Sequence, residues 1–181
     1  MVTYILEMIK YFFRDFLGNR VIIKTDKDNP EQITYHMRDN FLTRLESSLK
    51  TSGGRISITA SAILYLESNE NIYFLRLKAQ CNTRLIVKFE NSFSILIDDK
   101  LYHLNIEPNI TLIREYVNSG EHTYLEAYGS VVEKDFIKLI SNSKNVKIVI
   151  NGMVQEITGY LSKKNIERFR KFYYNYLEVN K

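Results

Sequence analysis

The feature that most constrains the fold of this sequence is the dipeptide Asn151-Gly152, which stands between two runs of alternating apolar residues. Asn-Gly suits a two-residue type I′ turn, because both central positions of that turn need φ > 0. With this turn, the antiparallel register places Ile150 opposite Met153. It also pairs the cation Lys147 with the anion Glu156. Apolar and opposite-charge pairs coincide in one register, so we predict a β-hairpin centred on this dipeptide.

Alternation of apolar and polar residues predicts further strands, since side chains alternate between the two faces of a sheet. The strands predicted in this way span residues 55–67, 73–79, 84–89 and 124–132. A second hairpin is predicted with Asp98-Asp99 as its turn, because this register places Ile95 opposite Tyr102. Residues 105–120 are mostly polar and are predicted to form a loop.

Four segments have the spacing of apolar residues that is typical of an amphipathic helix. These segments are residues 3–17, 37–49, 134–141 and 162–179. Gly18 and Gly53-Gly54 stand where the first two helices are predicted to end. Ser162 is a favourable N-cap for the last helix, whereas Glu133 stands at the less favourable N-cap of the third.

Together these elements predict an α+β protein. We expect mainly an antiparallel β-sandwich or bent sheet, with an N-terminal amphipathic helix and a C-terminal packing helix. Residues 1–54 are predicted to be a helical segment packed on the core. Residues 55–181 are predicted to be an antiparallel β domain that the last helix closes.

The order of these elements resembles a recurrent β-rich domain of uncharacterised bacterial proteins. The residues that carry the resemblance are Ile95-Leu96-Ile97-Asp98-Asp99, the strand and short helix of residues 124–140, and the Val-x-x-x-Ile-x-Gly strand of residues 146–152. The match spans residues 55–178, and it departs at Asp99, where Gly is more usual, and at Glu133. The resemblance implies a fold and carries over no catalytic residue.

Motifs for catalysis, metal binding or cofactor binding do not emerge from the sequence. His36, His103 and His122 have no ligand spacing such as H-x-H or H-E-x-x-H, and Cys81 is the single cysteine. Asp98-Asp99 lacks the regular ligand pattern of a calcium loop. We therefore expect no metal and no cofactor, and the sequence favours a non-catalytic role over an enzyme.

Two stretches are candidate binding surfaces. The last predicted helix carries basic residues on the side away from its apolar stripe, either as a solvated face or as a patch for an acidic protein, a phosphate or a lipid headgroup. The first predicted helix carries aromatic residues that suit docking on the core or on a partner subunit, or insertion into a membrane surface. The candidate binding residues are Lys163, Lys164, Arg168, Lys171, Phe12, Phe13 and Phe16.

The function that the sequence favours is a binding or assembly module that acts through contacts with a protein partner or a second copy. A peripheral membrane or lipid-binding domain is the first alternative, and an enzyme with an unrecognised site is the second. The net charge of +4 is too small to favour nucleic acid. The sequence shows neither a secretory signal nor about 20 consecutive apolar residues, so we expect a cytoplasmic protein, with a membrane-peripheral location as the alternative.

Overall fold

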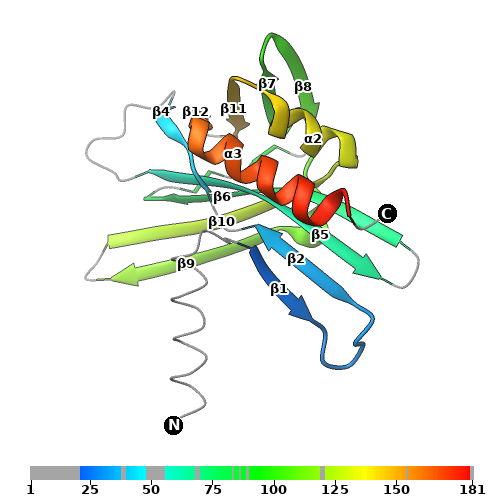
Figure 1. Cartoon of the computed structure of the whole chain (residues 1–181). Helices are drawn as coiled ribbons and strands as arrows, with labels where there is room; N and C mark the ends of the chain where they lie inside the picture. Colours follow the sequence, from blue (N-terminus) through cyan, green and yellow to red (C-terminus); the bar gives the residue numbers. More distant parts are fainter. Residues whose placement is uncertain are drawn as a thin grey trace, which may run out of the picture.

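Twelve strands and two α-helices make up the described part of the chain (Figure 1). The computed structural model describes residues 21–37, 40–47, 56–67, 70–82, 84–85, 87–88, 90–118, 121–153 and 155–179. All named strand pairs are antiparallel, and they form two sheets of seven and five strands. The prediction of a mostly antiparallel α+β fold is therefore confirmed.

The seven-stranded sheet, called the large sheet below, has the order β1-β2-β5-β6-β10-β9, and β3 pairs with β5 beside this path. Its strands are β1 (Val21–Thr25), β2 (Ile33–Met37), β3 (Asn40–Phe41), β5 (Ser57–Glu67), β6 (Glu70–Cys81), β9 (Leu112–Asn118) and β10 (Glu121–Val131). One face of β5 and β6 carries fully buried apolar residues at every second position, as the alternation predicts.

The five-stranded sheet, called the small sheet, has the order β4-β12-β11-β7-β8. Its strands are β4 (Thr43–Ser47), β7 (Phe93–Ile97), β8 (Lys100–Leu104), β11 (Val146–Asn151) and β12 (Glu156–Tyr160). The predicted hairpin at Asp98-Asp99 is confirmed, since Ile95 pairs with Tyr102. Asp98 adopts a φ of 49°, and its carboxylate accepts hydrogen bonds from the backbone N–H groups of residues 144 and 145.

Two helices pack against each other on the same side of the large sheet. They are α2 (Lys134–Asn142) and α3 (Lys163–Phe172), and α3 continues as a π-helical turn, η2 (Tyr173–Leu177). In Figure 1, α3 crosses in front of the large sheet, and α2 lies beside α3, near β7 and β8. Ser162 caps α3 as predicted, because its hydroxyl accepts a hydrogen bond from the N–H of Asn165.

Both sheets and both helices share one hydrophobic core. The rings of Phe93 in the small sheet and Tyr128 in the large sheet meet edge to face, with centroids 6.4 Å apart. Ile137 of α2 and Phe169 of α3 are fully buried in the same cluster. Burial of each such side chain contributes roughly 1.5–3 kcal/mol, so the helices are held firmly on the sheets.

The predicted turn at Asn151-Gly152 is wrong, although the hairpin itself is present. Asn151 pairs with Glu156, so Asn151 and Gly152 are not the central residues of a two-residue turn. Asn151 is instead bonded through its backbone to Ser92 and Lys88, and Gly152 forms an isolated bridge with Val87. Contacts with a distant segment thus override the local preference of Asn-Gly for a tight turn.

Three other local predictions are also wrong. The described residues of the stretch 37–49 do not form a helix: they contain β3 and β4, and Arg44 within β4 has a φ of 52°. The segment at residues 84–89 is no regular strand, since its described residues make only the isolated bridge at Val87. The predicted loop at residues 105–120 contains β9 and a 3₁₀ turn, η1 (Pro108–Ile110). The predicted helix over residues 3–17 lies outside the described residues.

Candidate functional site

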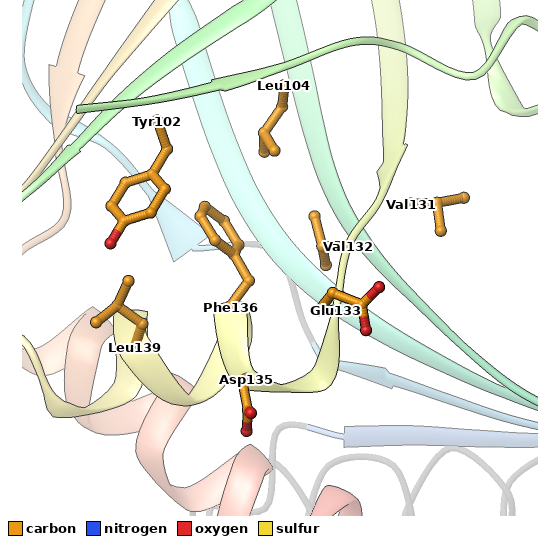
Figure 2. A pocket seen from close by; sticks show the side chains of 8 residues that line it. All are labelled: Tyr102, Leu104, Val131, Val132, Glu133, Asp135, Phe136 and Leu139. Carbon is orange, nitrogen blue, oxygen red and sulfur yellow. The ribbon is translucent and has the colours of Figure 1, made fainter. Parts of the chain in front are cut away.

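A groove about 590 Å³ in volume lies between the edge strand β8, the end of β10 and helix α2 (Figure 2). Its lining residues are Tyr102, Leu104, Val131, Val132, Glu133, Asp135, Phe136 and Leu139. Volumes of about 300–1,000 Å³ are usual for sites that hold a small ligand or a few side chains of a partner. The groove is open to solvent on one side, so it suits a segment that lies along it.

The floor and walls of the groove are apolar. The rings of Tyr102 and Phe136 meet edge to face, with centroids 5.3 Å apart, and Figure 2 shows them side by side at its centre. Leu139 and Val131 also line the groove and are 37% and 50% exposed. Apolar side chains that remain exposed in a concave place are typical of a surface that a partner or ligand covers.

Two carboxylates lie at one end of the groove. Glu133 is the N-cap residue of α2, and its side chain makes no capping hydrogen bond to the helix. Asp135 is in the first turn of α2, where the positive end of the helix dipole stabilises an anion. In Figure 2 both carboxylates point away from the ring of Phe136. The groove therefore combines an apolar floor with an anionic end.

A second cluster of interest is a row of polar side chains on the core-facing side of β10. His122, Tyr124, Glu126, Tyr128 and Ser130 occupy alternate positions of the strand and share one face. This is the face on which β6 carries buried apolar residues, because Tyr128 pairs with Leu77. A polar row on a core-facing strand departs from the usual pattern, so each member needs a partner.

The buried members of the row hold the segment of residues 84–88. Glu126, 1% exposed, accepts hydrogen bonds from the N–H of Leu85 at 2.9 Å and from the hydroxyl of Tyr128. The Tyr128 oxygen accepts one from the N–H of Val87 at 3.3 Å. Burial, and next the bond to Glu126, raises the pKa of Tyr128, and burial raises the pKa of Cys81 to about 11. The cluster is thus a structural clamp with protonated hydroxyl and thiol groups.

The exposed end of the same row forms a small hydrogen-bonded group. The Glu115 carboxylate lies 2.5 Å from Nδ1 of His122 and accepts a hydrogen bond from the Tyr124 hydroxyl at 3.1 Å. These bonds, that of His122 first, lower the pKa of Glu115. Within the described residues, no three His, Cys, Asp or Glu side chains are placed to hold a metal ion.

The structure places the predicted basic residues of α3 in two groups. Lys163, Lys164 and Lys171 are exposed. Arg168 instead donates hydrogen bonds to the side-chain oxygens of Asn40, at 2.9 Å, and Asn165, at 3.0 Å. Arg168 therefore ties α3 to β3, and this face of the helix offers fewer free cations than its sequence indicates.

The remaining candidate residues are the aromatic ones near the N-terminus, and the groove itself was not predicted from the sequence. Phe12, Phe13 and Phe16 lie outside the described residues. The groove was missed because its walls come from three separate elements. The one sequence feature that bears on the groove is the apolar period of α2. Phe136 and Leu139 follow this period, which predicts burial, but both remain partly exposed.

The fold and the groove together define an α+β domain of two antiparallel sheets with an apolar groove at the edge of the small sheet. Comparison with known proteins finds no match among family models, curated proteins or solved structures. Among the described helices, none has the length and apolar character needed to cross a bilayer.

Proposed function

We propose that this protein is a non-catalytic binding module, and that its groove between β8 and α2 receives an apolar segment of a partner protein that also carries a cation. The observation that supports this most directly is the pairing of an apolar floor with an anionic end in one concave surface. The floor is formed around Tyr102 and Phe136, and the anionic end by Glu133 and Asp135.

The apolar floor provides the binding energy in this proposal. Burial of exposed apolar surface contributes about 25 cal/mol per Å², so a large side chain of the partner over Phe136 and Leu139 would be an anchor. The ring pair of Tyr102 and Phe136 is rigid because both side chains also contact the core. A preformed floor lowers the entropy cost of binding.

The carboxylates provide selectivity. An arginine or lysine next to the anchor would meet Glu133 and Asp135 at the end of the groove. Exposed charge pairs add little affinity, but like charges at this position oppose binding. The expected partner segment therefore has at least one large apolar residue followed or preceded closely by a basic residue.

The membrane alternative has weaker support. It needs a cluster of free cations beside apolar residues. On α3, the cations that make no hydrogen bond or ion pair with the described part of the chain are Lys163, Lys164 and Lys171. Arg168 and Arg170 are engaged in hydrogen bonds within the fold. Co-sedimentation with vesicles that contain phosphatidylserine tests this alternative, and we expect no binding at physiological salt.

Selection of peptides from a displayed random library on the immobilised full chain tests the proposal. We expect enrichment of sequences that combine large apolar residues with lysine or arginine. The Leu139→Lys substitution should abolish this enrichment, because it places a cation on the apolar wall. The double substitution of Glu133 and Asp135 by lysine should shift the enriched sequences from basic to acidic residues.

Matched controls separate the groove from other surfaces. Val179→Lys changes an exposed apolar residue that does not line the groove, so it should leave the enrichment unchanged. Circular dichroism checks that each variant folds. Enrichment that persists in Leu139→Lys, or a charge preference that the double substitution leaves unaltered, would refute the proposal.

A further inference from the structure

Strand β9 is an edge of the large sheet, and its surroundings differ from those of a protected edge. Among the described strands its only partner is β10. Both faces of β9 are exposed, and four large apolar side chains stand on them: Leu112 43%, Ile113 41%, Tyr116 49% and Val117 63% exposed. Many natural edge strands are protected from pairing with another strand by proline or a bulge. β9 has neither, and its two charges, Arg114 and Glu115, stand between the exposed apolar side chains.

Within the described part of the chain, no strand pairs with the outer edge of the β9 backbone. In an antiparallel ladder, the N–H and C=O groups of successive residues point alternately to either side of the strand. The pairing with β10 runs without a bulge from Leu112 to Asn118. Every second residue of β9 therefore presents its N–H and C=O away from β10, at the spacing that another strand requires.

The charges of β9 indicate what kind of strand would fit. Glu115 already interacts with His122 and Tyr124 on its own sheet. Arg114, on the opposite face of the strand, is exposed and makes no side-chain hydrogen bond or ion pair with the described part of the chain. An added strand with an acidic residue opposite Arg114 would pair this charge.

A second copy of this chain fits the edge poorly. Two β9 strands that pair antiparallel, edge to edge, are related by a two-fold axis normal to the sheet. This rotation does not exchange the two faces of the sheet. Opposite residues must then belong to the same face, which prevents Arg114 from lying opposite Glu115 of the second copy. The two central registers place Arg114 opposite Arg114 or Glu115 opposite Glu115, and directly opposed like charges are destabilising.

We propose that β9 binds an extended segment of a partner protein by strand addition to the large sheet. In the antiparallel direction the complementary segment reads two apolar residues, a basic residue, an acidic residue and two apolar residues. The acidic residue lies opposite Arg114, and the apolar pairs lie opposite the four exposed side chains. Backbone hydrogen bonds hold the segment, and the alternate side chains select it. This surface is separate from the groove.

The test uses the full chain and a capped synthetic peptide with the order valine, valine, lysine, glutamate, valine, valine, extended by threonines. We expect the peptide to protect from hydrogen exchange those amides of residues 112–118 that point away from β10. β1, the opposite edge of the large sheet, should keep its exchange rates. A matched peptide with arginine in place of the glutamate should bind roughly fivefold more weakly.

Reversal of one charge in the protein is the matched control. Arg114→Glu should invert the preference, so that the arginine peptide becomes the tighter ligand. Absence of protection at β9, or a preference that Arg114→Glu does not invert, would overturn the proposal. Sedimentation of the chain alone tests whether a second copy occupies the β9 edge instead. A dimer that Tyr116→Lys dissociates would assign the edge to a second copy and overturn the proposal.

Discussion

The Oε1 atom of Glu126 accepts a hydrogen bond from the backbone N–H of Leu85 at 2.9 Å, inside the core. Leu85 belongs to a described segment that makes only one isolated bridge, so regular strand pairing does not satisfy its backbone. The side chains of β10 take over this role, with Glu126 bonded to Leu85 and Tyr128 bonded to Val87. The polar row of β10 thus replaces a missing strand.

The first prediction concerns Tyr128. Tyr128→Phe removes a hydroxyl that donates to Glu126 and accepts from the N–H of Val87. We expect the free energy of unfolding to fall by about 1–3 kcal/mol, because buried groups lose their partners. Urea denaturation measures the change. Tyr116→Phe, at an exposed position, is the control and should change stability by less than about 0.5 kcal/mol. Equal effects of the two substitutions would contradict the clamp.

A second prediction concerns the pH dependence of stability through Cys81. Burial first, and then the charge of Glu126, raises its pKa from 9.0 to about 11. A group with a raised pKa in the folded state contributes stability below its unfolded pKa, and this contribution is lost as the pH rises through the folded value. The free energy of unfolding should therefore decrease between about pH 9 and pH 11.

Other groups also titrate in this range, so the comparison with Cys81→Ala isolates the effect of the thiol. The difference in unfolding free energy between wild type and Cys81→Ala should shrink as the pH rises from 9 to 11. Alkylation by iodoacetamide provides an independent measurement, because only the thiolate reacts. At pH 9 the folded protein should react far more slowly than the urea-unfolded chain. Equal rates would show that Cys81 is accessible and ionised.

The parts of the fold that the sequence predicted correctly depend on local patterns. Alternation over β5 and β6 survives because both strands lie in the middle of a sheet with one face on the core. The register at Asp98-Asp99 follows from a turn whose first residue, Asp98, adopts a left-handed conformation that Asp tolerates. The start of α3 follows from the N-cap at Ser162. In each case the pattern of neighbouring residues was enough to predict the element.

The parts that failed depend on contacts between distant segments. The apolar spacing of residues 37–49 is compatible with one helix and also with two short strands that belong to different sheets. Only the pairing of β3 with β5, and of β4 with β12, distinguishes the strands from the helix. The strand β9 was missed because its apolar residues face solvent at an edge. The groove and the β9 edge are surfaces made by the arrangement of elements, so no single stretch of sequence predicts either.

The third prediction tests why residue 152 is glycine. A Cβ atom there would lie 2.4 Å from the carbonyl oxygen of Gln155 and 2.7 Å from Leu85. Gly152→Ala should lower the free energy of unfolding by about 1–3 kcal/mol, since the backbone must move apart. Gly152→Asn should cost at least as much. A type I′ turn would instead tolerate asparagine well. If Gly152→Asn leaves the free energy of unfolding unchanged, that result would favour a two-residue turn at Asn151-Gly152 over the hairpin register described above. Met153→Ala, at the exposed neighbour, is the control.

The last prediction concerns the exposed group on β9 and β10. Hydrogen bonds from His122, and then from Tyr124, lower the pKa of Glu115. A lowered pKa means that the carboxylate contributes stability above its unfolded pKa, and that this contribution is lost as the pH falls through the folded value. Carbon-detected NMR titration of the Glu115 carboxyl measures the shift. His122→Ala should raise the pKa of Glu115 more than Tyr124→Phe does, because the His122 bond is the larger cause.

The control for this titration is Tyr116→Phe, because Tyr116 neighbours Glu115 in sequence but lies on the other face of β9. It should leave the pKa of Glu115 unchanged. The effect should also persist at high salt, since a hydrogen bond at 2.5 Å is screened less than a long-range charge. If Glu115 titrates at the same pH in the wild type and in the variant that carries both His122→Ala and Tyr124→Phe, the three side chains do not form this group in solution. In that case Glu115 would face the β9 edge as a free anion, and a basic residue of an added strand would be attracted to it directly.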